Sequence, residues 1–209
     1  MAKVAKEFPN IKFEHATGYK TGENLSVYSS KFYQGRYIQG VIAGHMSETG
    51  KGGYIASFPI PEVIRGINAF YLGATSVNPD FDIDVIWVNS WYDPIKEADA
   101  AKVLISQDAD IITQHTDSPA PLQTAEQAGV KGFGQASDMY QFAPKAQLTA
   151  IIDDWGPYYI KRVQAVMDGT WKSSDTWGGM DSGMVKMAKY TNMPEKISFL
   201  HLDMNSSIA

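Results

Sequence analysis

The sequence predicts an α/β fold built on a mostly parallel sheet, for two reasons. From Tyr54 onward, short apolar stretches of strand length alternate with stretches of helical period. Three of the helical stretches also begin with a proline a few residues after a strand ends, namely Pro61, Pro94 and Pro119. Proline is favoured at the first helical position, where its missing N–H would have no partner anyway. The chain therefore marks its strand-to-helix edge three times, and ligands of parallel sheets bind at that edge.

The part of the chain before Tyr54 is less regular. The expected elements are a helix at residues 2–8, a strand at 11–16, a polar loop at 17–30 and a helix at 32–46. Gly40 and Gly44 predict a close approach of the last helix to a sheet, because glycine leaves room for a neighbouring backbone. The segment 47–53 (SETGKGG) has the composition of a linker and predicts a domain boundary.

After Tyr54, strands and helices are expected to alternate. The expected strands are 54–57, 83–88, 111–112, 130–133, 147–152 and 184–187, and the expected helices are 61–77, 94–106, 119–128 and 158–168. Asp93 and Ser118 stand where N-caps of two helices belong, and Gly129 ends the second of these. Residues 171–183 predict a surface connection, and no clear period follows Thr191.

Composition excludes several classes of function. The 209 residues carry a formal charge of −5, which argues against a nucleic-acid partner because phosphate binding needs a basic face. The chain contains no cysteine, so disulfides, thiolate catalysis and Cys-ligated metals are excluded. No apolar run is long enough to span a bilayer, and the first 20 residues lack the apolar centre of an export signal.

Polar and aromatic residues collect at the predicted strand-to-helix edge. The candidate ligand-binding residues there are Phe58, Ser90, Trp91, Tyr92, Thr116, Asp117, Gln135 and Asp138. Flat rings next to acceptors and amides suit a planar, hydrogen-bonding small molecule. Because adjacent residues of an extended chain face opposite ways, only one of Trp91 and Tyr92 is expected to contact the ligand.

The residues give weaker support to a metal site, a catalytic carboxylate pair or a dinucleotide site than to a small-molecule site. His115 and Asp117 are metal-ligand types, but two ligands in one turn do not make a site, so no metal is expected. Asp153 and Asp154 resemble a catalytic pair, yet adjacent strand residues point to opposite faces, which favours a hinge or helix-cap role. Gly132 and Gly134 lack the third glycine of a dinucleotide fingerprint.

Five segments carry a resemblance to a known family. They are FPIPEVIRGINAF (Phe58–Phe70), VNSWYDPIKEADAA (Val88–Ala101), QHTDSPA (Gln114–Ala120), GFGQASDM (Gly132–Met139) and KAQLTAIIDDWGPYYIKRVQAVMDGTW (Lys145–Trp171). Together they resemble the basic membrane protein (BMP) family, substrate-binding proteins of ABC transporters that are similar to purine-nucleoside receptor lipoproteins. The resemblance implies a non-enzymatic receptor without cofactor that captures a purine base or nucleoside. Its partner would be an ABC permease in the membrane, and its location the periplasm or a lipid anchor outside the cell.

The resemblance also implies a type I periplasmic-binding-protein fold, in which two parallel-sheet lobes are joined by hinge crossings. The first lobe would hold residues 1–48 and 154–180, and the second 49–153 and 183–195, with 196–209 unplaced. The hinge would include Asp153, Asp154 and Trp155. The first lobe is expected to be incomplete, because the family begins with βα units that would precede Met1, and the expected C-terminal helix and strand are not recognisable either.

The resemblance also reduces the range of ligands that we expect. Trp91 would stack on the base, and Thr116 and Asp117 would contact it, with Asp138 in the matching loop. In nucleoside-binding members an aspartate and a lysine hold the ribose, and the matching positions here are Ala136 and Asp153. This difference favours a base without ribose, and a carboxylate that accepts from an exocyclic amine favours adenine.

Two other classes stay open from the residues alone. The first is a nucleoside hydrolase-like enzyme using Asp117, Asp138 and His115, and the second is the ligand-sensing effector domain of a regulator.

Overall fold

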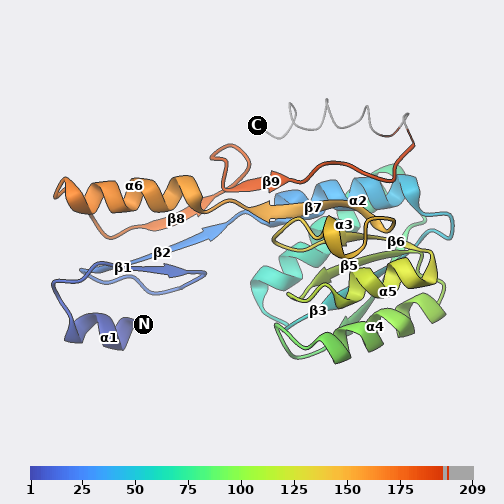
Figure 1. Cartoon of the computed structure of the whole chain (residues 1–209), viewed down its shortest axis with the longest axis horizontal. Helices are drawn as coiled ribbons and strands as arrows, with labels where there is room; N and C mark the ends of the chain where they lie inside the picture. The colour runs from blue at the N-terminus through green and yellow to red at the C-terminus, as the bar shows by residue number, and fades with distance from the viewer. Residues whose placement is uncertain (195–196, 198–209) are drawn as a thin grey trace. The chain divides into compact units, whose positions relative to one another are not determined.

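The computed structural model describes residues 1–194 and Ile197, which form two compact units (Figure 1). The first unit contains residues 1–31 and 153–186, and the second contains residues 32–152 and the described residues from 187 onward. The chain therefore passes between the units after residues 31, 152 and 186. The expected boundary at residue 48 is wrong by this division, because helix α2 (Tyr33–Met46) packs on helix α3 (Pro61–Val77) within the second unit.

The first unit is a small parallel sheet with two helices. Its elements are α1 (Ala2–Glu7), β1 (Phe13–Ala16), β2 (Leu25–Ser30), α6 (Gly156–Met167) and β8 (Asp175–Gly178). The strands lie in the order β1-β2-β8, and both pairs are parallel. Strands β2 and β8 lie in segments for which a loop and a surface connection were expected, so those two expectations are wrong.

Polar side chains in these two strands interrupt the hydrophobic pattern from which strands are predicted. In β2, Ser26 is fully buried between Leu25 and Val27. The Ser26 hydroxyl accepts hydrogen bonds from Arg162 Nη2 (2.7 Å) and from the backbone N–H of Ser174 (3.0 Å). Burial of a polar side chain is tolerated when it is hydrogen-bonded. Both hydrogen-bond partners of Ser26 lie more than 130 residues further along the chain. The neighbouring residues therefore do not indicate that this serine is buried in a strand.

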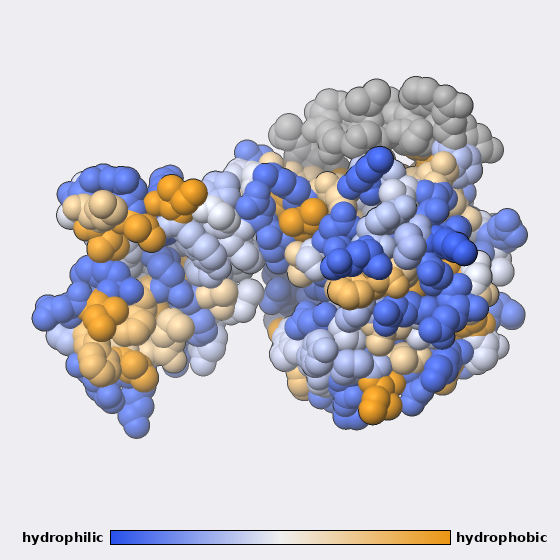
Figure 2. All heavy atoms as spheres, in the orientation of Figure 1, coloured by the Kyte–Doolittle hydropathy of each residue, from blue (hydrophilic) through white to orange (hydrophobic). Residues whose placement is uncertain are grey.

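Helix α6 exposes an apolar stripe that the sequence pattern would assign to the core. Ile160, Val163 and Met167 recur at helical spacing, but their side chains are 72%, 59% and 75% exposed. Figure 2 shows apolar side chains on the surface of the first unit over this helix. The buried side of α6 is instead aromatic, with Tyr158 packed on Tyr28 at 4.8 Å between ring centroids.

The second unit is a six-stranded sheet with helices on both faces. Besides α2 and α3, its elements are β3 (Lys51–Ala56), β4 (Asp82–Trp87), α4 (Pro94–Ser106), β5 (Ile111–His115), α5 (Ala120–Ala128), β6 (Lys131–Gly134), the 3-10 turn η1 (Tyr140–Phe142) and β7 (Gln147–Asp153), with β9 (Val185–Met187) at the edge. The strand order is β4-β3-β5-β6-β7-β9, and the pairs from β4 to β7 are parallel. The predicted α/β class with parallel sheets is confirmed.

Alternate residues of the central strand β3 meet different helices. Ile55 packs with Leu104 of α4 and Leu122 of α5 in one buried cluster. Tyr54 faces the other side, where its ring lies 6.0 Å from that of Phe70 in α3. This alternation follows from the two-residue repeat of a strand.

The segment 47–53 is a tight connection within the second unit, and not a linker. The Asp110 carboxylate accepts hydrogen bonds from Ser47 Oγ (2.5 Å) and from the backbone N–H groups of Glu48 (2.7 Å) and Thr49 (3.0 Å). Lys51–Gly53 already belongs to β3. Gly53 serves the close packing of β3 against α4, since a Cβ on Gly53 would lie 2.8 Å from Leu104 Cβ.

Candidate functional site

The carboxyl ends of β3, β4 and β5 meet at one edge of the second unit. The register pairs Ala56 with both Trp87 and His115, so the three strands end side by side. The loops that follow carry Phe58, Trp91 and Asp117. The Phe58 and Trp91 rings are 5.6 Å apart between centroids, and Trp91 lies 6.1 Å from His115. We call Phe58, Trp91, His115 and Asp117 together the aromatic–acid rim.

Backbone contacts tie the rim together. The N–H of Asp117 donates to the carbonyl oxygen of Trp91 at 2.8 Å, which joins the β4–α4 loop to the β5–α5 loop. Trp91 is 40% exposed and Tyr92 is 64% exposed. A half-exposed indole that is held at its edges by other rings presents its free area for stacking.

His115 is the last residue of β5 and lies behind Trp91. It is 5% exposed, and its ring also lies 5.7 Å from that of Phe32. Burial, followed by the positive charge of Arg36, lowers the pKa of His115 to about 3. Its imidazole is therefore neutral at physiological pH.

Several buried polar atoms near the rim lack a hydrogen-bond partner among the residues that the structure describes. They are Tyr54 OH, Ser57 Oγ, Gln114 Oε1, His115 Nδ1 and Thr116 Oγ1. Buried polar groups are nearly always paired, and an unpaired one is commonly explained by a bound water or ion or by a functional role. All five stand at or near the carboxyl ends of β3 and β5, and His115 itself belongs to the aromatic–acid rim.

Arg36 of α2 holds the sheet edge from the helix side. Its fully buried guanidinium donates from Nη1 to Thr113 Oγ1 (3.0 Å) and from Nη2 to the carbonyl oxygen of Gln114 (2.5 Å) and to Gln135 Oε1. Gln135, which the sequence placed in the candidate site, is itself 6% exposed. Its side-chain oxygen is thus used within the protein, and its predicted contact with a ligand stays a prediction.

Two further candidate residues, Asp138 and Ser90, do not belong to the aromatic–acid rim. The Asp138 Oδ1 atom accepts from the N–H of Tyr140 (3.0 Å) and from Gln147 Nε2 (2.7 Å), which braces the β6–β7 loop. Asp138 also borders a cavity of about 150 Å³ with Tyr140 and Lys189. Ser90 is half-buried in the Trp91 loop. The structure brings Phe58, Trp91, Thr116 and Asp117 to one edge, while the contacts of Asp138 lie in its own loop.

Asp117 has an unusual electrostatic environment. Its side chain reaches the surface. Desolvation of the carboxylate by the surrounding loops, and then the negative charge of Glu97, raise the pKa of Asp117. Because desolvation destabilises the ionised Asp117 carboxylate, a ligand that donates a hydrogen bond to this carboxylate stabilises it.

The predicted hinge residues lie where the chain passes between units. The division falls between Ile152 and Asp153. Asp154 forms an ion pair with Lys186 at 2.5 Å, and the hydrogen bond from Lys186 lowers the pKa of Asp154. The Trp155 ring lies 5.1 Å from Tyr28 in the first unit. The hinge role of these three residues stays a prediction.

Sequence reasoning missed Arg36 and Glu97, the buried charged residues of this region. Glu97 follows the N-cap Asp93 by four residues, and its carboxylate returns to the N–H of Asp93. A glutamate in the first turn after a capping aspartate was therefore the available signal. No pattern marks Arg36, because its partners at the sheet edge, Thr113, Gln114 and Gln135, lie 77 to 99 residues further along the chain, and only Gln39 is a near neighbour in sequence.

A family comparison places the chain. The model of the Bmp family, described as "ABC transporter substrate-binding protein PnrA-like", matches residues 1–205. The chain belongs to this family. The predicted family is therefore confirmed.

Two relatives are similar over most of this chain. A protein named purine-binding protein from Brucella abortus (strain 2308) is 65% identical over 198 residues, which is 95% of this chain and 57% of that protein. A protein named putative ABC transporter glucose-binding protein from Haloferax volcanii is 43% identical over 184 residues, 88% of this chain and 47% of that protein. The chain thus spans about half the length of these relatives.

Solved structures share the fold. A solute-binding protein of an ABC transporter system from Conexibacter woesei superposes with a TM-score of 0.76 at 19% identity, covering 99% of this chain and 71% of that one. A transcriptional activator of the comK gene from Bacillus halodurans gives 0.83 at 21% identity, covering 98% and 72%. A periplasmic binding protein/LacI regulator from Alkaliphilus metalliredigens also matches, with a TM-score of 0.62. The type I periplasmic-binding-protein architecture is confirmed.

The part of the chain that the structure describes offers neither a metal-binding cluster nor a membrane-spanning helix. Among residues 1–194 and Ile197, no group of three or more His, Asp or Glu side chains is arranged to hold a metal ion. In the same part of the chain, no helix is both long and apolar enough to cross a bilayer.

Proposed function

We propose that this chain is part of the substrate-binding component of an ABC importer and that its second unit contributes to binding a purine base. The observation that carries the proposal is the aromatic–acid rim, in which Trp91 and Asp117 are joined by a backbone hydrogen bond of 2.8 Å. The 65% identity to a protein named as purine-binding supports the ligand class.

The rim supplies both parts of purine recognition. The exposed face of Trp91 stacks on the flat ring system, with Phe58 and His115 supporting the indole. Asp117 accepts a hydrogen bond from an exocyclic amine, which favours adenine over hypoxanthine because hypoxanthine presents an oxygen there. Ala136 stands where the family resemblance places the ribose-binding aspartate, so that carboxylate is missing, which favours a free base.

The proposal extends to the transport cycle. A ligand bound by both lobes stabilises a closed form, which a membrane permease then recognises. Asp153, Asp154 and Trp155, at the second passage between units, are the proposed hinge. The working location is the outside of the cell membrane, in the periplasm or on a lipid anchor.

The proposal assigns no catalysis to the site. The two relatives described above are named as binding proteins, which supports a receptor and not an enzyme. Chromatography of adenosine incubated with the protein tests this point, and release of free adenine would contradict it.

Calorimetric titration with adenine, guanine, hypoxanthine, adenosine and D-glucose tests the ligand. We expect adenine to bind most tightly and Trp91→Ala to weaken adenine binding by about tenfold or more, since stacking on an aromatic ring contributes about 1–3 kcal/mol per base. The control is Tyr71→Ala in α3, because the Tyr71 side chain is similarly exposed at 41% and lies outside the rim. Tight binding of adenosine without binding of any base would refute the base assignment.

A further inference from the structure

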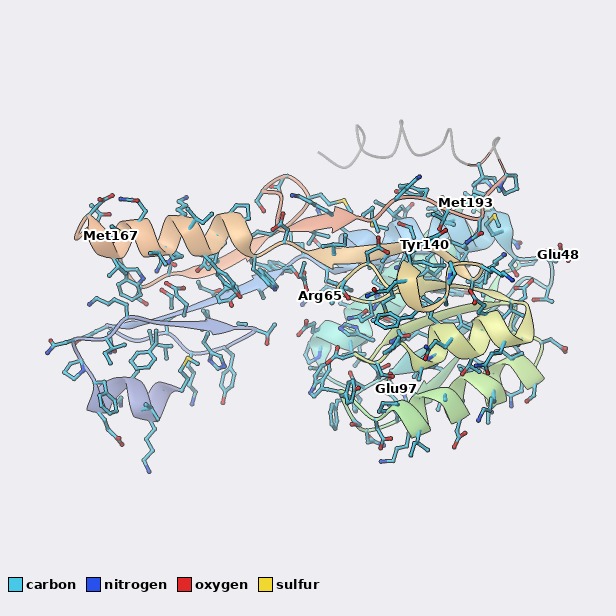
Figure 3. The ribbon with its side chains drawn as sticks, in the orientation of Figure 1. Glu48, Arg65, Glu97, Tyr140, Met167 and Met193 are labelled. Carbon is cyan, nitrogen blue, oxygen red and sulfur yellow. The ribbon has the colours of Figure 1, made fainter. Side chains whose placement is uncertain are left out.

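Glu97 stands directly behind the aromatic–acid rim. It lies in the first turn of α4 (Figure 3), and its side chain is completely buried. Its Oε1 atom accepts from the N–H of Asp93 at 2.8 Å. Its Oε2 atom accepts from Ser118 Oγ at 2.6 Å and from the N–H of Ser118 at 3.2 Å. One carboxylate therefore takes three hydrogen bonds from two different loops.

These two loops carry the proposed ligand contacts. Asp93 ends the loop that holds Trp91, and Ser118 follows Asp117 directly. The bond between Asp117 N–H and the Trp91 carbonyl lies between the same two loops. Glu97 thus closes a second bridge behind the first, and together the two bridges fix the spacing of the stacking ring and the acceptor.

A neutral side chain cannot make the same bridge. The two backbone N–H groups of Asp93 and Ser118 both need an acceptor, and each carboxylate oxygen of Glu97 serves one of them. A glutamine of the same shape has one acceptor oxygen only. Burying a carboxylate is costly unless it is fully hydrogen-bonded, so its presence here indicates that the bridge has a role.

We propose that Glu97 is the positioning residue of the candidate purine site: its carboxylate holds the Trp91 and Asp117 loops together as one rigid rim. This inference rests on the proposed function, since it concerns the same ligand. It predicts that Glu97 influences not only how tightly adenine binds but also how binding depends on pH.

The pH dependence follows from the groups around Asp117. Glu97, from α4, adds to desolvation in raising the pKa of Asp117. His115, on the strand before Asp117, is neutral above about pH 3, and the Arg36 charge behind it is constant. Asp93, in the neighbouring loop, is paired with Lys96 at 3.3 Å. Because ionised Asp117 is the acceptor for the amine, adenine binding weakens as the pH falls and Asp117 becomes protonated.

The test compares Glu97→Gln with Ser118→Ala by calorimetric titration of adenine from pH 4 to pH 8. Ser118→Ala removes one hydrogen bond of the bridge but keeps the Glu97 charge. Glu97→Gln loosens the bridge and also removes the charge. At neutral pH we expect Glu97→Gln to weaken binding by about tenfold, the usual size for loss of a hydrogen bond to a charged group, and Ser118→Ala to weaken it less.

The two variants are expected to differ in their pH profiles. In Glu97→Gln the weakening of binding at low pH moves to lower pH than in the wild type, while in Ser118→Ala it stays in place. Titration of adenine itself is common to all proteins and cancels in the comparison. A profile of Glu97→Gln that coincides with the wild type, or an equal displacement in Ser118→Ala, would overturn the inference.

Asp117→Asn provides an independent check that leaves the Glu97 bridge intact. Because the titrating acceptor is gone, its residual adenine binding is expected to follow the titration of adenine alone, and a profile identical to the wild type would overturn the inference. If the wild-type chain binds no purine at any pH, the proposed function fails, which is a result distinct from either of these.

Discussion

At the scale of single residues, His115 has the most unusual environment of the candidate site. Its ring lies between Trp91 and Phe32, and its Nδ1 atom is buried without a partner in the described part of the chain. A guanidinium nearby, that of Arg36, further disfavours a second positive charge. The fold therefore holds this imidazole neutral at a free-energy cost that depends on pH.

The first prediction concerns acid stability. The folded pKa of His115 is about 3, whereas an unfolded chain has the ordinary value near 6.5. The unfolded state binds the proton more readily in this window, so the free energy of unfolding falls as the pH drops from about 6.5 towards 3 and is unaffected above it. At pH 5 the loss from this residue is about 2 kcal/mol.

Urea denaturation at pH 7.5 and pH 5.0 measures this loss. We expect His115→Phe to lose about 2 kcal/mol less between these pH values than the wild type, because the proton-binding group is absent. The control is His45→Phe at an exposed position, which should follow the wild type. Equal losses in all three proteins would contradict the prediction.

At the scale of elements, the second unit depends on the close contact between α2 and α3. A Cβ on Gly40 would collide with the carbonyl oxygen of Phe70, and a Cβ on Gly73 would collide with that of Tyr37. Gly40 and Gly44 were expected to face a sheet, but they face the backbone of α3. This contact places Arg36 over the ring of Tyr54 at 5.5 Å and so supports the sheet edge from behind.

The second prediction is that Gly40→Ala destabilises the second unit by about 1–3 kcal/mol. The added methyl group forces the two helices apart, and overpacking of this kind usually costs that much. Equilibrium unfolding in urea, followed by circular dichroism, measures the change. Leu72→Ala on the exposed side of α3 (60% exposed) is the matched control and should change stability by less than about 0.5 kcal/mol. A neutral Gly40→Ala would show that the helices adjust freely.

At the scale of the whole molecule, family membership and a ligand assignment are different kinds of conclusion. The family model matches residues 1–205, but the two relatives are named for different ligands, a purine in one and glucose in the other. We propose the purine, because the exposed indole of Trp91 can stack on a planar base and Asp117 can accept from an exocyclic amine. Whether the chain binds a purine or glucose can be measured directly.

The third prediction is that adenine stabilises the chain and D-glucose does not. A ligand that binds only the folded state raises the free energy of unfolding by about 2.7 kcal/mol at a concentration 100 times its Kd. Urea denaturation with and without each compound measures this gain. Stabilisation by glucose alone would overturn the purine assignment and favour the ligand named for the Haloferax relative.

Local signals were sufficient for much of the fold. Helices α3 and α4 have the predicted bounds, because Pro61 and Pro94 start them, and Asp93 accepts the expected capping hydrogen bond from the N–H of Lys96 at 3.2 Å. Helix α5 starts at Ala120, one residue later than expected, and ends before Gly129 in the left-handed conformation. Each signal depends on a few neighbouring residues, so a single sequence is enough to read it.

The sequence by itself determined the α/β class, most helices and the edge at which Phe58, Trp91 and Asp117 gather, since proline, capping residues and the hydrophobic period act locally. Only the tertiary structure decided that α2 belongs to the second unit, that β2 and β8 are strands, and that Glu97 joins two loops of the rim. These features depend on contacts between residues 20 to almost 150 positions apart. A hydrogen bond or backbone contact at such a separation leaves no mark on the residues next to it in the chain.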